Sequence, residues 1–332
     1  MKTKEKKRKP SMQDLIMAKL GYTVFAKHAQ IWLQTGSKNL NKVLGSKRFG
    51  IPAGKIFEIR GKKHAGKTAL VMFLAALAQR LLNAYVIWID AEASLTNESE
   101  TPAKEFQNAW ATKMGLNTEA DNFYCVGPKI LKSKKQRKRG KKVTKSGTKF
   151  LQSAESMFEE TEAAIDIIKD QDPDRPIFIA LDSIANLQTE GQVDAGHLGK
   201  NMRTQLDRAM FLSGALPRLS ALAANYNCWV FLINQIRTNP SVMFGNPEYS
   251  PGGKAVEHNA HVQVDMRPFK GGVILEGDEV IGVRGKLVNV KNKAGGGSLQ
   301  SQLAAYQVTF SKPAKRMWKF FPLARKDKKE KE

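Results

Sequence analysis

The sequence predicts an α/β fold in which a mostly parallel central sheet is flanked by helices. First, apolar runs typical of strands alternate with runs typical of helices from Lys55 onward, an order that favours parallel strands with helical crossovers. Second, Gly61–Thr68 follow one such strand and open an unbroken apolar helix. Third, shorter β-like runs follow Pro247 and indicate an antiparallel extension of the same sheet.

The N-terminal region, residues 1–34, reads as a basic tail followed by a short amphipathic helix over Ser11–Lys27. Apolar side chains recur there at helical spacing: Leu15, Ile16, Leu20, Val24 and Phe25. Gly36–Ser37 and Gly50–Gly54 then mark loops on either side of a short helix around Leu40–Leu44.

The main domain, residues 35–311, carries the alternation of strands and helices. We expect strands at 55–60, 85–90, 122–126, 176–182 and 228–234, and helices at 67–82, 102–114, 152–170 and 198–225. The later β-like runs lie at 261–266, 272–276, 280–290 and 304–310. These ranges predict one domain built around one sheet.

The net charge of +23 is concentrated in three segments. Residues 129–149 hold eleven Lys or Arg residues and no acid, residues 1–9 carry +5, and the basic C-terminal tail, residues 312–332, carries +6. The rest of the chain is therefore nearly neutral. Basic segments of this kind bind polyanions such as nucleic acids in a salt-dependent manner; the alternative is that they serve only solubility.

The basic segment at 129–149 interrupts the main domain. It has almost no apolar residue that could anchor it, so we expect a disordered insertion. It follows the strand that ends at Val126, and ligand sites in such sheets lie at the carboxyl ends of the strands. The insertion should therefore project from the same edge as Gly61–Thr68.

Composition excludes several classes of protein. No run of 18 apolar residues is present, so no transmembrane helix and no membrane partner are expected. Met1–Lys9 are not followed by the apolar stretch of a secretory signal. Cys125 and Cys228 both lie in strand-like runs, which favours two buried thiols in a reducing, cytoplasmic compartment.

The residues after the first strand fit the pattern G-x-x-x-x-G-K-[ST]: Gly61, Lys62, Lys63, His64, Ala65, Gly66, Lys67 and Thr68. Between a strand and a helix, the backbone N–H groups of such a loop surround phosphates. Lys67 would reach the β- and γ-phosphates, and Thr68 would offer its hydroxyl to Mg²⁺. The sequence thus predicts binding of a nucleoside triphosphate; the alternative is an ordinary glycine-rich turn.

Two further strands end in acidic residues. The strand at 85–90 leads to Asp90 and Glu92, which could align or deprotonate an attacking water or simply cap the next helix. The strand at 176–182 has four apolar residues before Asp182, which is the Walker-B pattern. Asp182 would hold Mg²⁺ opposite Thr68. Ser183, the next residue, would lie at the nucleotide.

A third strand ends in Asn234 and Gln235. A glutamine side chain cannot act as a base, but it can donate to a γ-phosphate and accept from water. The eighteen residues from Ile236 to Gly253 contain three prolines and three glycines. A loop of that length inside a compact domain is usually functional or disordered.

Several segments resemble the bacterial RecA recombinase family closely and occur in the same order. They are Gly36–Ser37, Gly50–Gly54, Ile89–Glu92, Asn234–Arg237, Val242–Glu248, Gly252–Gly253 and Val290–Lys293. The resemblance covers about residues 35–310. It implies a RecA-type P-loop NTPase core that uses ATP and Mg²⁺, with residues 1–34 acting as a subunit-interface arm.

The resemblance also implies roles at the nucleotide. Lys67 and Thr68 would bind phosphate and Mg²⁺, Asp182 would be the Walker-B acid, and Glu92 would be the general base. Gln235 would sense the γ-phosphate and pass its state to the loop that follows.

Two lysines near the end of the core gain a role only from this resemblance. Lys291 and Lys293 would reach across a filament interface to the ATP of the neighbouring subunit, so that hydrolysis requires assembly. Positive charge placed there would stabilise the transferring phosphoryl group. Without the resemblance they read as a solvated strand end.

The resemblance places single-stranded DNA on two loops, residues 188–200 and 236–253. The implied DNA-binding residues are Arg203, Arg237, Met243, Phe244, Asn246, Gly252 and Gly253.

The chain departs from the family pattern in several places. Trp110 stands where a Tyr stacks on adenine, and an indole would keep that stacking. His258 and Glu257 replace an interface Phe and a Lys, changes that bear on filament cooperativity. The family's small C-terminal domain and acidic tail are expected to be absent; Trp318, Phe320 and Phe321 of the basic tail would pack on the core or stack on bases.

The RecA resemblance, together with these motifs, therefore implies an ATP-dependent homologous recombinase that forms filaments on single-stranded DNA, pairs it with homologous duplex DNA and exchanges strands. Single-strand-binding and loader proteins are possible partners, and a bacterial cytoplasm, at the nucleoid or during bacteriophage infection, is the expected setting. Two alternatives are an ATP-gated DNA-coating filament protein without strand exchange and a RecA-fold helicase. Intact Glu92, Lys67 and Gln235 argue against the first; the Met243–Glu248 loop and the lysine pair argue against the second.

Overall fold

The computed structural model describes most of the chain. The described residues are Met12, Lys19, 30–95, 110–127, 152–194, 202–238, 248–294, 303–310, 312 and 314–322. The basic insertion at 129–149 lies outside them, as do most of the N-terminal arm and the end of the tail. The chain divides into two compact units, Met1–Gln30 and Ile31–Glu332. In the first unit Met12 and Lys19 are helical; the fold below is that of the second.

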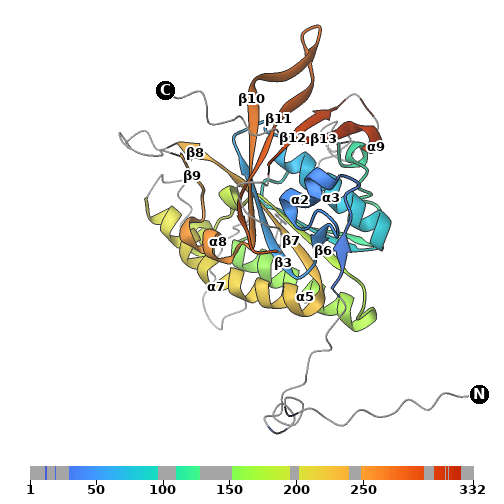
Figure 1. Ribbon diagram of the computed structural model, residues 1–332. Helices are drawn as coiled ribbons and strands as arrows, with labels where there is room; N and C mark the ends of the chain where they lie inside the picture. The colour runs from blue at the N-terminus through green and yellow to red at the C-terminus, as the bar shows by residue number, and fades with distance from the viewer. Residues whose placement is uncertain are drawn as a thin grey trace, which may run out of the picture. The chain divides into compact units, whose positions relative to one another are not determined.

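A nine-stranded sheet forms the centre of the second unit, in the order β13-β12-β11-β10-β3-β7-β6-β4-β5 (Figure 1). The six strands from β10 to β5 are mutually parallel, and β11 to β13 are added in antiparallel fashion. Their bounds are β3 Lys55–Gly61, β4 Tyr85–Asp90, β5 Phe123–Val126, β6 Ile177–Asp182, β7 Cys228–Gln235, β10 Val262–Glu276, β11 Glu279–Asn292, β12 Leu303–Thr309 and β13 Trp318–Pro322. The predicted parallel sheet with an antiparallel extension is confirmed.

Helices cover both faces of this sheet (Figure 1). Their bounds are α2 Lys38–Leu44, α3 Lys67–Leu82, α5 Ala154–Gln171, η1 Ile184–Asn186, α6 Glu190–Asp194, α7 Met202–Tyr226, α8 Gly253–Asn259 and α9 Ala314–Met317. Four short strands complete the described elements: β1 Trp32–Leu33, β2 Ile51–Pro52, β8 Arg237–Thr238 and β9 Glu248–Tyr249. Of the helix expected at 102–114, only residues 110–114 are described, and they are helical.

Strand β7 shows how the sequence builds two cores. Its side chains alternate between the faces of the sheet, as they must in a strand. Phe231 packs in the core beneath α2 and α3, whereas Val230 packs in the core beneath α5 and α7. Phe231 also stacks on Phe57 and Phe178 of other strands, with ring centroids 4.7 and 5.0 Å apart. A continuous apolar run is therefore required for a strand buried on both faces.

The structure differs from the sequence-based expectations at several places. Residues Glu190–Asp194, expected in a loop, form helix α6. The runs expected at 261–266 and 272–276 form one strand, β10, which pairs with β11 through register shifts. Residues 318–322, which we expected in the tail, form β13; Trp318 is buried and stacks on Phe320. Cys228 is fully buried, but Cys125 is only partly covered, so the prediction of two buried thiols is wrong for Cys125.

The turn at the end of β3 depends on Gly61. A Cβ atom there would lie 2.5 Å from the main-chain oxygen of Met266 on β10. Gly66 then adopts φ +87°, a left-handed conformation that glycine enters without strain, and α3 begins at the next residue. Two glycines thus let the chain leave the sheet and enter the helix within a few residues.

We predict that Gly61→Ala destabilises the fold by about 1–3 kcal/mol, because the added methyl group must displace the backbone of β10. Gly214→Ala is the matched control, since a Cβ at that position in α7 meets nothing within 4 Å and alanine favours a helix by about 1 kcal/mol. Urea unfolding of both variants measures the difference. Equal midpoints would contradict the close approach of β10.

Candidate active site

The loop between β3 and α3 holds Lys67 in a buried position. Its side chain is 8% exposed, and its Nζ donates a hydrogen bond to the carbonyl oxygen of Lys62 at 2.9 Å. Burial lowers the pKa of Lys67, although Asp182 and Glu92 act in the opposite direction. The ammonium group is therefore poorly solvated and faces two carboxylates, and an anion in the loop would stabilise its charge.

Tyr306 of β12 fixes the loop from the other side. Its hydroxyl donates to the carbonyl oxygen of Ala65 at 2.8 Å, and its ring is fully buried. Burial raises the pKa of Tyr306 above its usual range, so the phenol stays protonated and remains a donor. The sequence offered no signal for this residue, because β12 carries no motif and lies far from the loop in the chain.

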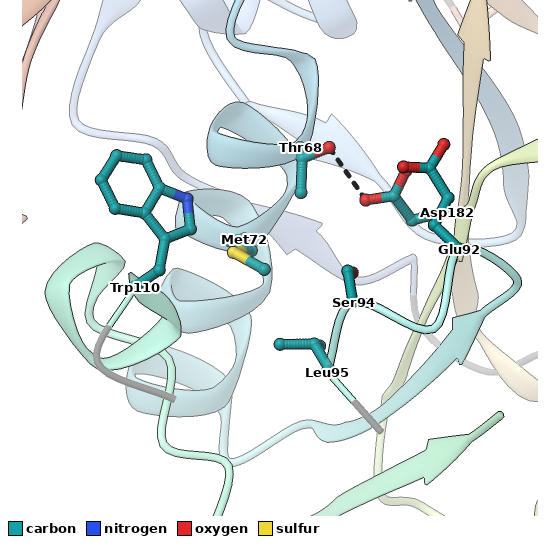
Figure 2. A pocket seen from close by; sticks show the side chains of 7 residues that line it. All are labelled: Thr68, Met72, Glu92, Ser94, Leu95, Trp110 and Asp182. Carbon is teal, nitrogen blue, oxygen red and sulfur yellow. Dashed lines mark hydrogen bonds between the residues drawn. The ribbon is translucent and has the colours of Figure 1, made fainter. Parts of the chain in front are cut away.

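Thr68 and Asp182 meet where α3 faces the end of β6. Thr68 Oγ1 donates to Asp182 Oδ2 at 2.8 Å, and Asp182 is 3% exposed (Figure 2). Burial is the main cause, and the nearby charge of Glu92 the second cause, of the rise in the pKa of Asp182 to about 7. A hydroxyl and a carboxylate oxygen are ligands that Mg²⁺ accepts, and a cation would offset the cost of burying this charge. The two residues therefore fit the predicted metal site.

Glu92 lies beside Asp182 and receives hydrogen bonds from two other strand ends. Its Oε1 accepts from Ser183 Oγ at 2.6 Å and from Gln235 Nε2 at 3.3 Å. Ser183 follows β6 and Gln235 ends β7, so three parallel strands deliver these groups to one point. The structure thus brings together residues that the sequence could relate only through separate motifs.

Asp90, the other acid after β4, has a different place. It is fully buried and accepts from the backbone N–H of Ser94 at 2.9 Å, from the Ser94 hydroxyl at 3.1 Å and from the N–H of Leu95 at 2.5 Å. Asp90 therefore stabilises the turn after β4, while Glu92 reaches the site. The strand pattern alone does not separate the roles of the two acids, whereas the RecA resemblance names Glu92 as the residue at the site.

These side chains border a cavity of about 370 Å³ (Figure 2). It is lined by Thr68, Met72, Glu92, Ser94, Leu95, Trp110 and Asp182. Trp110 stands on its wall and packs edge-on against Phe310, with ring centroids 5.0 Å apart. One end of the cavity is therefore acidic and polar, and the other offers an aromatic ring and aliphatic side chains.

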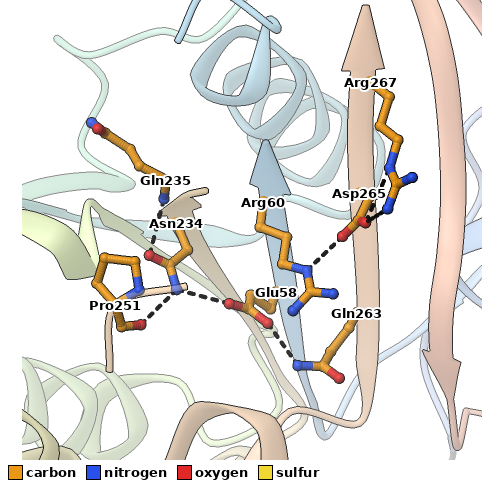
Figure 3. Close-up of polar contacts among 8 residues, drawn as sticks. All are labelled: Glu58, Arg60, Asn234, Gln235, Pro251, Gln263, Asp265 and Arg267. Atoms are coloured by element: carbon orange, nitrogen blue, oxygen red, sulfur yellow. Dashed lines mark hydrogen bonds and ion pairs between the residues drawn. The ribbon is translucent and has the colours of Figure 1, made fainter. Parts of the chain in front are cut away.

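A buried polar network joins β3, β7 and β10 (Figure 3). Asn234 Nδ2 donates to Glu58 Oε1 and to the carbonyl oxygen of Pro251, both at 2.8 Å, and Asn234 Oδ1 accepts from the backbone N–H of Gln235 at 2.9 Å. Gln263 Nε2 donates to Glu58 Oε2 at 2.7 Å. Burial raises the pKa of Glu58 despite these donors. The network ties Gln235 to the chain just before Gly252.

A second, smaller cavity of about 130 Å³ lies next to that point. It is lined by Arg208, Ala209, Arg237, Tyr249, Ser250, Pro251, Gly252 and Gly253. We call it the arginine pocket. Arg237, Gly252 and Gly253 were expected to share a site, and the structure brings them together. Met243, Phe244 and Asn246 lie outside the described residues, and of Arg203 the structure describes only the helical backbone.

Arg208 and Tyr249 are additions that sequence reasoning missed. Arg208 Nε donates to the carbonyl oxygen of Leu187 at 2.9 Å, which fixes the guanidinium beside Arg237. Burial, followed by the charge of Arg237, lowers the pKa of Arg208. Two arginines held together without a described carboxylate in the pocket lining favour an anionic ligand. The sequence carries no signal for Arg208, because its bond goes to a backbone carbonyl 21 residues away in the chain.

Comparison with known proteins now decides the family. The model of the RecA N-terminal domain matches residues 151–312. The chain is 31% identical over 265 residues to Protein RecA of Geobacter sulfurreducens, and the aligned region covers 79% of this chain and 62% of that protein. It is 32% identical over 261 residues to Protein RecA of Pseudomonas fluorescens, covering 79% and 60%. Protein RecA of Mannheimia haemolytica is also 32% identical to the chain, in an alignment that covers 79% of this chain and 57% of that protein.

The chain belongs to the RecA family. It spans about three-fifths of the length of the curated RecA proteins that it matches. The RecA-type core that the resemblance implied is the fold described above. Within the described residues, no helix combines the length and the apolar character needed to cross a bilayer.

The two lysines that the RecA resemblance assigns to a neighbouring subunit lie away from the cavity that Thr68 and Asp182 line. Lys291 pairs with Gln263 near the start of β10, whereas the phosphate loop leaves β3 beside Met266. Lys291 Nζ donates to the carbonyl oxygens of Glu257 and His258 at the end of α8, the latter at 3.2 Å. Lys293 follows β11 at the same end of the strand. Neither lysine lines the cavity of its own chain.

We predict that Tyr306→Phe destabilises the fold by about 1–3 kcal/mol, because the buried carbonyl of Ala65 loses its hydrogen bond. Nucleotide affinity should fall as well, since the loop is no longer held in place. Tyr226→Phe is the control: it removes a partly covered hydroxyl for which the described structure shows no hydrogen bond. Urea unfolding and titration with ATP measure both effects. A Tyr306 variant that matches the control would contradict this role.

Proposed function

We propose that this chain is an ATP-dependent homologous recombinase. It would bind single-stranded DNA as a helical filament, pair that strand with homologous duplex DNA and exchange strands, hydrolysing ATP as it does so. The observation that carries the proposal is the convergence of Glu92, Ser183 and Gln235 beside Lys67 and Asp182. Gln235 lies directly before a segment whose described ends line the arginine pocket. The side-chain amide of Gln235 therefore lies between the cavity that Glu92 lines and the arginine pocket.

The cavity suits ATP in size and in the character of its walls. At about 370 Å³ it lies in the range of small-molecule sites. Trp110 and Met72 would cover the base, and Lys67 with the loop N–H groups would hold the phosphates. Thr68 and Asp182 would hold Mg²⁺, which when bound supplies positive charge to the phosphate oxygens.

Glu92 has the geometry of a general base. Its carboxylate is held by Ser183 at 2.6 Å, so one oxygen keeps a fixed direction toward the cavity that Glu92 lines. Such a group can align a water and accept its proton. Gln235 donates to the same oxygen at 3.3 Å; a γ-phosphate would offer this amide a competing acceptor. The occupancy of the phosphate site would thereby change the position of Gln235.

Assembly would complete the site. Lys291 and Lys293 lie outside the cavity of their own chain, and on assembly they would serve the ATP of a neighbouring subunit. They would place positive charge on the transferring phosphoryl group. Hydrolysis would then depend on filament formation, and filament formation on DNA.

The arginine pocket would hold the DNA backbone. Arg208 and Arg237 would contact a phosphate, the N–H groups of the Gly252–Gly253 turn would add donors, and the half-exposed ring of Tyr249 could stack on a base. Residues 129–149 would add a non-specific attraction to duplex DNA through their charge. Sequence preference should be slight, because none of these contacts reads a base edge.

We predict that Glu92→Gln lowers DNA-stimulated ATP hydrolysis by about 10²–10⁴-fold, because the amide cannot accept the proton of water. Binding of ATP and of single-stranded DNA should persist, since glutamine keeps an acceptor for Ser183. Steady-state phosphate release and fluorescence anisotropy measure the two properties.

Strand exchange with homologous and non-homologous duplex DNA completes this test in the wild-type protein. Exchange confined to the homologous duplex supports a recombinase. Filaments on DNA without hydrolysis or exchange would instead identify a coating protein, and unwinding of a duplex from one end would identify a helicase.

We predict that Arg208→Ala weakens binding to single-stranded DNA of any sequence. The slope of log affinity against log salt should fall by about 0.7, the value for one phosphate contact on a single strand. Arg218→Ala is the control, because it removes the same charge from the same helix, where Arg218 pairs with Glu162. Anisotropy titrations over a range of salt concentrations measure the slopes. Equal slopes in the two variants would remove Arg208 from the DNA site.

A further inference from the structure

Lys62 stands at a junction between the phosphate loop and a segment far along the chain. Its carbonyl oxygen accepts the hydrogen bond from Lys67 Nζ at 2.9 Å. Its own ammonium group pairs with Glu248 Oε1 at 3.1 Å. One residue therefore contacts the lysine that would hold the phosphates and, through its side chain, an acid of strand β9.

Strand β9 leads from that contact to the arginine pocket. It consists of Glu248 and Tyr249 and pairs with β8, where Thr238 faces Glu248 and Arg237 faces Tyr249. Neighbouring side chains of a strand point in opposite directions. Glu248 thus meets the phosphate loop, while Tyr249, the next residue, lines the arginine pocket together with Arg237.

We propose that the ion pair between Lys62 and Glu248 couples the phosphate loop to the arginine pocket. Lys62 is then a positioning residue: it acts through Glu248 on β9 and touches no reacting atom. This inference rests on the proposed function, because it takes the ligands of the two sites to be ATP and single-stranded DNA.

The chemistry of the loop explains how a nucleotide would act on this pair. A triphosphate held by the loop would draw Lys67 Nζ from the carbonyl of Lys62 and would bring several negative charges to the loop that carries Lys62. Those charges compete with Glu248 for Lys62. Loss or rearrangement of the pair changes the restraint on β9, and therefore on Tyr249 and Arg237. By linkage, a ligand in the arginine pocket changes nucleotide affinity by the same factor.

The size of the effect follows from exposure. The side chain of Lys62 is 66% exposed and that of Glu248 is 30% exposed, so solvent screens the pair strongly. Pairs of this kind contribute little, and the coupling they carry corresponds to a change of about two- to fivefold in affinity.

The test is a double-mutant cycle on the coupling itself. Affinity for a fluorescent oligothymidylate is measured by anisotropy with and without a slowly hydrolysed ATP analogue, and the ratio of the two affinities is the coupling factor. In Lys62→Met and Glu248→Gln we expect this factor to move toward one by about two- to fivefold. The double variant should match each single variant, because all three break the same pair.

Lys270→Met is the control. It removes the same charge from an exposed position of β10 outside both sites, and within the described residues Lys270 forms no ion pair, so the coupling factor should stay at the wild-type value. The inference is overturned by a factor that is unchanged in Lys62→Met or Glu248→Gln, by additive effects in the double variant, or by an equal change in Lys270→Met. Wild-type protein that binds neither probe would overturn the proposed function itself, an outcome distinct from these.

Discussion

The rest of the site depends on the carboxylate oxygen of Glu92 that Ser183 and Gln235 share. Those three residues follow or end β4, β6 and β7, which are consecutive in the sheet, and β7 also borders β3 and the phosphate loop. This order places Gln235 between the loop and the paired acids. A different strand order would leave every motif intact in sequence and separate the groups in space.

The buried network around Glu58 links the position of Gln235 to the arginine pocket. A buried carboxylate is tolerated only with donors, and Glu58 obtains them from Asn234 and Gln263. Asn234 also holds the carbonyl of Pro251. Asn234, the neighbour of Gln235, thus fixes the chain just before Gly252. An arrangement that left one of these buried polar groups without a hydrogen bond would be costly. Polar burial here specifies one arrangement of the two sites.

Local patterns predicted much of this structure, and non-local contacts account for what they missed. The proximity of Lys67, Thr68 and Asp182 could be predicted because each motif joins a strand end to a loop, and such ends meet at one edge of a parallel sheet. Tyr306 and Arg208 were missed because their partners, Ala65 and Leu187, are distant in the chain and the bonds go to backbone atoms. No spacing in a single sequence records contacts of that kind.

Helix α8 connects the remaining parts. It begins at Gly253, in the arginine pocket, and ends at carbonyls that accept from Lys291. A helix of seven residues has about two turns joined by backbone hydrogen bonds, so a displacement of the glycine turn would be carried to its other end. In the proposed filament, DNA bound at Gly252–Gly253 would therefore shift the carbonyls that hold Lys291. The position of Lys291, which would serve the neighbouring subunit, would then depend on whether its own subunit has bound DNA.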